Sequence, residues 1–412
     1  MKVSVIGTGY VGLISGVGYA SQGHEVICVD VIEGKVAKIN AGEAPIHEEG
    51  LPERLKQVLD SGKFRATSNI SDAVENSDIC FISVGTPSAS DGSIDLKYIE
   101  QASKDLGTAL KNKDSYFTIV VKSTVTPGTT EECVIKNVEA ASGKKAGQDF
   151  GVCMNPEFLR EGKAIEDFDN PDRIVIGSFD EKSAEALKEL NSAFDCPVLE
   201  TPLSTAEMIK YVSNAFLAVK ISYANDVAEF CKKIGADPYE VFKGVGMDKR
   251  INPAFFNSGL GWGGSCFPKD TKEFAAAAKR EGANPRIVDA AIETNKKLPS
   301  KLVELAGDIS GKTVAVLGLA FKAGTDDVRE SQAVEVIKLL NDGGAKIQAY
   351  DPEAAEVEGI ERAETMENAL EGADICLVLT EWPEFENVPF SGKIIDGRNI
   401  VKNRENYEGL FW

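Results

Sequence analysis

A glycine-rich turn near the start of the chain is the feature that most restricts its fold. Gly7, Gly9 and Gly12 follow an apolar run at residues 3–6 and open an alanine- and glycine-rich helical stretch. A second apolar run then ends at Asp30. This order of strand, glycine turn, helix and strand predicts a β-α-β unit and therefore a parallel sheet.

The same turn predicts a dinucleotide cofactor. The first glycine permits a tight turn, the second lets the backbone approach a pyrophosphate, and the third lets helix and strand pack closely. Asp30 is placed to bind a ribose 2′-hydroxyl, which favours NAD over NADP because a carboxylate repels a 2′-phosphate, although Lys35 lies nearby. The alternative is a glycine turn that binds no ligand, and the complete pattern favours the cofactor.

The alternation of apolar runs and helical stretches predicts the first domain, an NAD-binding Rossmann-like domain at residues 1–200. From residue 202 an apolar stripe at helical spacing predicts one long helix to Gly235, with Ser204 and Glu207 at capping-box spacing. Further helical sequence is expected to end near Pro299. This stretch is predicted to form a central helical domain, residues 201–300, whose long helix joins domains or subunits.

Strand-like runs return from Lys312, and residues 373–378 resemble residues 77–82. This internal similarity predicts a second Rossmann-like domain at residues 301–412. The expected fold is therefore α/β, with two doubly wound domains joined by a long central helix and a helical middle domain.

Composition excludes several classes of function. The 45 basic and 65 acidic side chains give a net charge of −20, which disfavours binding to nucleic acid. No run of 18 apolar residues suits a membrane helix, and the first residues are typical of a strand instead of a leader, so we expect a soluble, cytoplasmic protein. The eight cysteines are scattered and there are two histidines, so neither disulfides nor a metal site is expected.

Residues 261–270 carry the strongest chemical signal. Three glycines are expected to leave the backbone open to a ligand and to deliver Cys266 to a site that also holds Lys269 and Asp270. A neighbouring cation favours the nucleophilic thiolate. The alternative is a buried structural cysteine, as the other cysteines in apolar runs are interpreted to be. A thiolate beside a nicotinamide cofactor predicts oxidation of an alcohol to an acid through a thiohemiacetal and a thioester.

Two further pairs of polar residues are candidates for the same site. Lys210 and Asn214 are four apart on the predicted long helix, so they share one face, and their apolar neighbours suggest a helix covered on most sides. Glu157 and Glu161 follow a predicted strand end, where parallel sheets place their ligand-binding loops. They suit acid-base work, and equally the acidic start of a helix.

With these motifs the sequence resembles the nucleotide-sugar dehydrogenases, which oxidise a primary alcohol to a carboxylate. The resemblance extends over essentially the whole chain and rests on residues 7–12, 83–87, 122–124, 155–162, 206–211, 263–270, 321–322, 329–331 and 396–398.

The resemblance implies a role for individual residues. Cys266 would form the thiohemiacetal and thioester, Lys210 and Asn214 would stabilise the oxyanion, and Asp270, Glu157 and Thr124 would hold or activate water. The implied NAD contacts are Gly7, Gly9, Tyr10, Val11, Gly12, Asp30, Lys35, Thr86, Thr124, Glu161, Lys269 and Arg329. The implied sugar-nucleotide contacts are Phe158, Leu159, Arg160, Glu161, Lys210, Asn214, Phe255, Phe256, Asn257, Ser258, Gly259, Gly263, Lys322 and Arg398. Arg250 would reach the substrate from the other subunit, which implies a homodimer.

The resemblance favours UDP-glucose as the substrate. Ser265 stands where members acting on N-acetylhexosamines usually have histidine, which favours a sugar with a 2-hydroxyl group. GDP-mannose or another sugar nucleotide of the same family is the alternative. Two other classes are a catalytically silent NAD-sensing protein, which would not need the reactive residues, and a two-electron alcohol dehydrogenase, which would not need Cys266.

Overall fold

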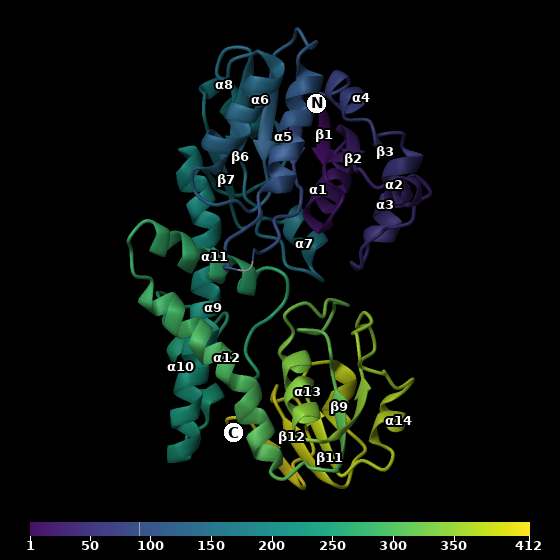
Figure 1. The fold of residues 1–412 in the computed structure, drawn as a ribbon, viewed down its shortest axis with the longest axis vertical. Helices are drawn as coiled ribbons and strands as arrows, with labels where there is room; N and C mark the ends of the chain where they lie inside the picture. Colours follow the sequence, from purple (N-terminus) through teal and green to yellow (C-terminus); the bar gives the residue numbers. More distant parts are fainter. Residues whose placement is uncertain (90) are drawn as a thin grey trace. The chain divides into compact units, whose positions relative to one another are not determined.

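The computed structural model describes residues 1–89 and 91–412, which form two compact units, Met1–Val212 and Ser213–Trp412 (Figure 1). Each unit is built around its own sheet. The long helix α9, Leu203–Ile234, begins in the first unit and continues into the second.

The sheet of the first unit has eight strands in the order β3-β2-β1-β4-β5-β6-β7-β8. All neighbours pair in parallel except β6 and β7, which are antiparallel. The first six positions follow the strand order of dinucleotide-binding folds. The strands are β1 Lys2–Ile6, β2 Glu25–Val29, β3 Phe64–Thr67, β4 Ile79–Ile82, β5 Phe117–Val121, β6 Phe150–Met154, β7 Ile174–Ser178 and β8 Val198–Thr201.

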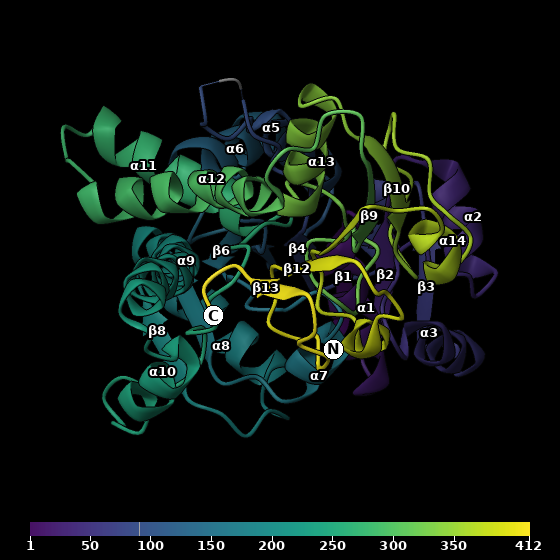
Figure 2. The same ribbon diagram turned by 90° about the horizontal axis from the view of Figure 1, so that it is seen from below.

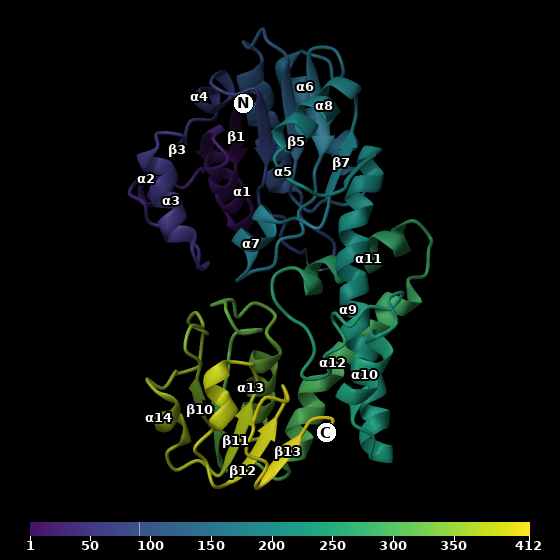
Figure 3. The ribbon, with the colours of Figure 1, turned by 180° about the vertical axis from the view of Figure 1, so that it is seen from behind.

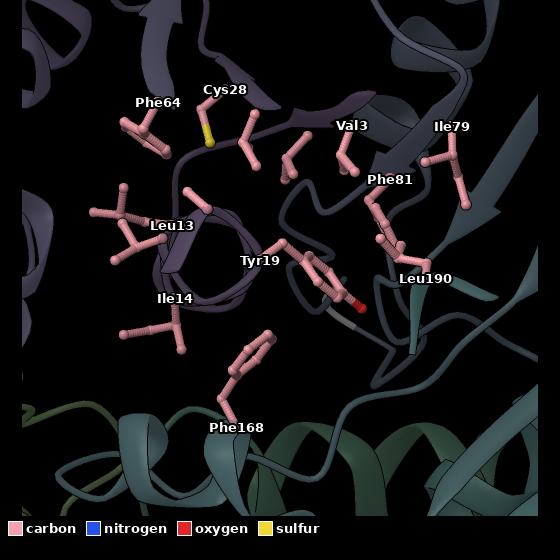
Figure 4. Packing of buried hydrophobic residues seen from close by; sticks show 14 of the residues in the cluster. Val3, Leu13, Ile14, Tyr19, Cys28, Phe64, Ile79, Phe81, Phe168 and Leu190 are labelled. Atoms are coloured by element: carbon pink, nitrogen blue, oxygen red, sulfur yellow. The ribbon is translucent and has the colours of Figure 1, made fainter. Parts of the chain in front are cut away.

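Helices cover both faces of this sheet because its strands are apolar on both sides. One core holds side chains of α1, α3, α7 and α8, and the other holds side chains of α4, α5, α6 and α9. In the first core the ring of Tyr19 lies between Phe81 and Phe168 (Figure 4). The helices are α1 Tyr10–Ser21, α2 Glu33–Asn40, α3 Leu51–Asp60, α4 Ile70–Glu75, α5 Lys97–Leu110, the π-helix η1 Thr130–Ile135, α6 Lys136–Ser142, α7 Ala164–Asp169 and α8 Glu181–Leu190.

The sheet of the second unit has five parallel strands in the order β10-β9-β11-β12-β13 (Figure 3). This is the other common doubly wound order. One face packs against α12 and α13, which lie side by side (Figure 2), and the other against α14 and the 3₁₀-helix η2. The strands are β9 Thr313–Leu317, β10 Lys346–Tyr350, β11 Ile375–Val378, β12 Lys393–Asp396 and β13 Tyr407–Gly409; the helices are α10 Pro238–Gly246, α11 Phe267–Arg280, α12 Arg286–Ala306, α13 Gln332–Asp342, α14 Met366–Leu370 and η2 Pro383–Asn387.

The expected fold class is confirmed, and two expectations for helices are wrong. Helical sequence does not end near Pro299, because α12 runs through that proline to Ala306. The proposed capping box is absent because α9 already begins at Leu203, and Glu207 binds a turn of the sheet domain instead. Within residues 1–89 and 91–412, no helix combines the length and the apolar character that crossing a membrane requires.

Candidate active site

The glycine turn has the geometry that its sequence predicts. Gly7 has a φ of +97°, which favours glycine, and a Cβ at Gly12 would lie 1.9 Å from the Gly7 carbonyl oxygen. At Gly9 a Cβ would meet no atom within 4 Å. The tight turn accounts for Gly7 and the close packing for Gly12, and the open space at Gly9 suits close approach of a phosphate.

Asp30 at the end of β2 is bound to the same turn. Its Oδ2 accepts hydrogen bonds from the Thr8 N–H (3.1 Å) and hydroxyl (2.5 Å), and its Oδ1 accepts one from the Ile32 N–H (3.0 Å). Burial works to raise the pKa of this carboxyl, but these bonds and the charge of Lys35 hold the pKa below its ordinary value. The carboxylate is therefore fixed in its charged form beside the open space at Gly9, and these residues fit an NAD ribose.

A buried group of polar side chains lies at the carboxyl ends of β5 and β6. Lys210 Nζ on α9 donates to Glu157 Oε1 at 2.8 Å, and Lys122 Nζ donates to Asn155 Oδ1 at 2.8 Å. Asn155 in turn donates to the Val175 carbonyl at 2.8 Å. The structure thus brings together Glu157 and Lys210, two residues that the sequence analysis selected separately.

The charges of this group depend on one another. Burial lowers the pKa of Lys122 to about 8, an effect that Glu157 partly offsets and that Lys210 reinforces. Burial also works to raise the pKa of Glu157, but Lys210, the Leu159 N–H and Lys122 hold it below its ordinary value. The hydrogen bond from Lys210 and the nearby charge of Lys122 therefore both favour the charged form of Glu157.

Two predicted threonines follow neighbouring parallel strands. Thr86 is buried after β4, and Thr124 is partly buried after β5. The carboxyl ends of parallel neighbours meet at one edge of a sheet, so both lie at the edge that carries the glycine turn and Glu157. The segment 158–162 continues from Glu157 and is more exposed, with Arg160 paired to Asp167.

The second unit contains the candidate nucleophile. Cys266 is half-buried at the N-terminal cap of α11, and its Sγ lies 3.5 Å from the Ser265 hydroxyl. The N-terminus of a helix favours a thiolate. One turn later, buried Asp270 accepts hydrogen bonds from Asn214 Nδ2 on α9 (2.6 Å) and from Lys269 Nζ (2.5 Å). Asn214 is thus joined to the segment that carries the cysteine.

The expected reason for the glycines before Cys266 is wrong. A Cβ at Gly261 would lie 2.1 Å from Asn295 Oδ1, and one at Gly263 would lie 2.4 Å from the Glu330 carbonyl oxygen. At Gly264 it would lie 2.8 Å from the Phe321 ring. Protein atoms occupy the space at these glycines, so each glycine first serves packing of the loop.

The remaining predicted substrate residues differ in their surroundings. Phe256 is buried and stacks on Phe242, and the Gly259 N–H donates to Asn225. Arg398 is partly buried and donates to the carbonyls of Leu379, Gly261 and Phe321. The others are Phe255 with a φ of +65°, exposed Asn257, buried Ser258, and Lys322 over the Phe321 ring.

Two arginines that the resemblance places at the ligands, Arg250 and Arg329, are exposed. The Arg250 side chain is 88% exposed and pairs with Asp248, and the Arg329 side chain pairs with Asp327. The Arg329 carbonyl also accepts a hydrogen bond from the Gly264 N–H at 3.0 Å.

Sequence reasoning did not assign a role to two buried charged residues. Lys122 directly follows five buried strand residues, and a charge in that position is a signal for a site at the sheet edge. Glu48 lies in a polar loop between α2 and α3, and its neighbours give no sequence signal of its burial.

Models of the UDP-glucose/GDP-mannose dehydrogenase family match three consecutive parts of the sequence. Its NAD binding domain matches residues 1–195, its central domain residues 204–297, and its UDP binding domain residues 315–403. The chain belongs to this family. The resemblance inferred from the motifs is confirmed, as is NAD as the cofactor, and this family member is an NAD-dependent oxidoreductase.

Individual relatives match over the full length. UDP-glucose 6-dehydrogenase AglM of Haloferax volcanii is 45% identical over 100% of both chains, and UDP-glucose 6-dehydrogenase TuaD of Bacillus subtilis is 44% identical over 98% of this chain and 90% of its own. Among solved structures, a UDP-glucose dehydrogenase of Pyrobaculum islandicum matches this family member with a TM-score of 0.96 and 43% identity, over 100% of this chain and 98% of the other.

Proposed function

We propose that the protein oxidises UDP-glucose to UDP-glucuronate with two NAD and one water, by way of a thioester on Cys266. The names of the relatives and the match to a UDP binding domain support this substrate. One observation carries the proposal for the chemistry: Cys266 stands at the N-cap position of α11, and Asp270, one turn away, is fixed by hydrogen bonds from Asn214 and Lys269.

The proposed reaction removes four electrons from C6 of the sugar. NAD, when bound, supplies the hydride acceptor for both oxidations. The alcohol first loses a hydride and a proton and becomes an aldehyde. The Cys266 thiolate adds to the aldehyde carbon, and loss of a second hydride leaves a thioester. Water then attacks the carbonyl carbon, the C–S bond breaks, and the products are a carboxylate, protons and the regenerated thiol.

The other residues would stabilise charge and hold water in these steps. Lys210 and Asn214 would donate to the oxyanion of the thiohemiacetal, since each already directs a side-chain N–H toward a carboxylate. Glu157 and Asp270 would hold the hydrolytic water together with Thr124. Glu157 is ionised in its buried setting, which suits a group that accepts hydrogen bonds from water.

We propose binding roles on the same basis. Residues 1–200 would form the NAD domain, with contacts from the glycine turn, Asp30, Lys35, Thr86, Thr124 and Glu161, and Lys269 and Arg329 would contribute from the rest of the chain. Residues 201–300 would form the central domain, and residues 301–412 the domain for the sugar nucleotide. The sugar nucleotide would contact segment 158–162, residues 255–259, Gly263, Lys322 and Arg398.

A homodimer is part of the proposal. On one face of α9, Val212 is 46% exposed, Phe216 61% and Phe230 62%, so the expectation of a helix covered on most sides is wrong for the single chain. Contiguous exposed apolar side chains are typical of a protein interface. A second copy of the chain would cover this face and would bring in Arg250. The protein would act in the cytoplasm, a reducing compartment that suits a chain whose described cysteines form no disulfide.

The test is the number of NADH formed per UDP-glucose consumed, measured beside GDP-mannose. We expect two NADH from UDP-glucose, and no UDP-glucuronate from the Cys266→Ser variant, because its hydroxyl is a far weaker nucleophile than a thiolate. Cys133→Ser is the matched control, since Cys133 is also half-buried but lies in η1. A single NADH, or turnover that does not depend on Cys266, would contradict the mechanism. Turnover with GDP-mannose but not with UDP-glucose would make GDP-mannose the assigned substrate and would leave the proposed reaction steps unchanged.

A further inference from the structure

Glu48 is a buried carboxylate that joins three segments of the first unit. It lies between α2 and α3 and is 4% exposed. Its Oε2 accepts hydrogen bonds from the Tyr10 hydroxyl and from the Gly162 N–H, the latter at 2.8 Å. Its Oε1 accepts one from the Ala164 N–H at 2.6 Å.

The partners of Glu48 belong to the two segments that would hold the two ligands. Tyr10 is the first residue of α1, directly after the glycine turn. Gly162 ends the segment 158–162, and its N–H also lies 2.9 Å from the Tyr10 hydroxyl oxygen. One carboxylate and one phenol thus connect the glycine turn to segment 158–162.

This connection is costly to disturb because its groups are removed from water. A buried carboxylate is stable only when hydrogen bonds replace its hydration, and here a hydroxyl and two backbone N–H groups provide them. Burial and the neighbouring Glu48 raise the pKa of Tyr10, so its hydroxyl stays protonated and acts as the donor. A shift of either segment therefore changes the hydrogen bonds of the other.

We propose that Glu48 is a positioning residue that couples NAD binding at the glycine turn to sugar-nucleotide binding at segment 158–162. The inference rests on the proposed function for the ligands of the two segments. When one ligand orders its own segment, Glu48 orders the other segment as well, so each ligand raises the affinity for the other. Such coupling is reciprocal, and its usual size is about 5-fold to 150-fold in affinity.

The test is calorimetric titration of UDP-glucose with and without saturating NADH, which forms a ternary complex that does not turn over. We expect NADH to tighten UDP-glucose binding by at least about 5-fold in the wild type and by less than about 2-fold in Glu48→Gln. The glutamine keeps the size of the side chain but places an NH2 group toward backbone N–H groups. If Glu48 only stabilised the fold, the variant would bind each ligand more weakly even in the absence of the other. The proposal instead expects the affinity for each ligand alone to stay within about 2-fold of the wild type.

Two other variants make the result specific. Tyr10→Phe removes the hydroxyl and leaves Glu48 bonded to the Gly162 and Ala164 N–H groups, so the coupling should fall in this variant as well. This variant tests the inference even if Glu48→Gln folds poorly. Asp169→Asn is the control: Asp169 fixes the other end of α7 through a bidentate pair with Arg54 at 2.7 and 2.8 Å, and its loss should leave the coupling unchanged.

The inference is overturned if the coupling is unchanged in both Glu48→Gln and Tyr10→Phe, or if the wild type shows no coupling. The proposed function stands in either case as long as the enzyme forms two NADH per UDP-glucose. Failure of the wild type to bind or oxidise UDP-glucose would instead count against the proposed function.

Discussion

At the scale of single residues, Lys122 shows how burial changes the response of a charge to pH. The pKa of its ammonium group is lowered to about 8, mainly by burial, in the group that also contains Glu157 and Lys210. The folded state therefore binds this proton more weakly than the unfolded state, whose lysine pKa is about 10.4. The cost of the buried charge is full below pH 8 and is lost as the pH rises from 8 toward 10.4.

We expect the Lys122→Met variant to lack this pH dependence. The free energy of unfolding of the wild type, relative to the variant, should increase by about 2 kcal/mol between pH 7 and pH 9.5. Denaturant unfolding at both pH values measures the difference. Lys38→Met, which removes an exposed lysine of α2, is the control and should show no such change. A constant difference for Lys122→Met would mean that the pKa of Lys122 is not lowered into this range, and that the ammonium group stays charged in the folded and the unfolded protein up to pH 9.5.

Sequence predicts a residue in the site when its own neighbours carry the signal. Cys266 was selected by its glycine-rich segment, and Lys210 with Asn214 by helical spacing. Glu48 carries no such signal, because its partner Tyr10 is distant in sequence. The strand before Lys122 indicates a position at the sheet edge but not the hydrogen bond to Asn155. The hydrogen bonds that define these two residues exist only in the folded chain.

At the scale of elements, Glu207, the fifth residue of α9, connects this helix to the loop that carries Thr124. Its carboxylate accepts hydrogen bonds from the Gly128 N–H (2.5 Å), the Thr130 N–H (2.8 Å) and the Thr130 hydroxyl (2.6 Å). Burial raises its pKa to about 7 in spite of these bonds. Glu207 thus fixes the start of η1 against the helix that carries Lys210.

We expect Glu207→Ala to loosen this loop. The two N–H groups would lose their acceptor, at a cost of about 1–3 kcal/mol for each group that stays buried, so the variant should be destabilised by about 2–4 kcal/mol. Hydrogen exchange of residues 128–135 should become faster. Glu132→Ala, in the same π-helix but exposed and paired with Lys136, should change stability by less than about 0.5 kcal/mol. Equal effects of the two variants would contradict the role of Glu207 in fixing this loop against α9.

Elements with regular apolar patterns were predictable, and their ends and contacts were not. Strand β1, Lys2–Ile6, contains the apolar run at residues 3–6 that predicts a strand, and these four residues are buried. The capping box failed because spacing alone cannot show that Glu207 binds a turn 77 residues away. Pro299 does not end α12, which continues to Ala306, because Leu298, Leu302 and Ala306 pack in the core on both sides of the proline and outweigh its lost hydrogen bond and steric clash.

At the scale of the whole molecule, the apolar face of α9 leads to a test of the dimer. Replacing Phe216, which is 61% exposed, by glutamate should not affect the core of either unit. In the proposed dimer the same change would bury a charge in the interface. Phe216→Glu should therefore shift the mass in solution from dimer to monomer, as measured by light scattering after size-exclusion chromatography. Phe179→Glu is the control, because Phe179 is 47% exposed and lies outside α9. A dimeric Phe216→Glu variant would place the interface elsewhere.

A heterodimer of two differently mutated subunits tests whether Arg250 acts on the substrate of its own subunit or on that of the partner. One subunit carries Cys266→Ser and the other Arg250→Ala, with different tags so that only the heterodimer is purified. If Arg250 acts on the partner's substrate, the subunit with intact Cys266 receives an intact arginine, and the heterodimer should regain about half of the wild-type activity. The heterodimer of wild type with Cys266→Ser gives the reference for one working site. If Arg250 acted within its own subunit, no subunit would hold both groups, and the mixed dimer would be no more active than the Arg250→Ala homodimer.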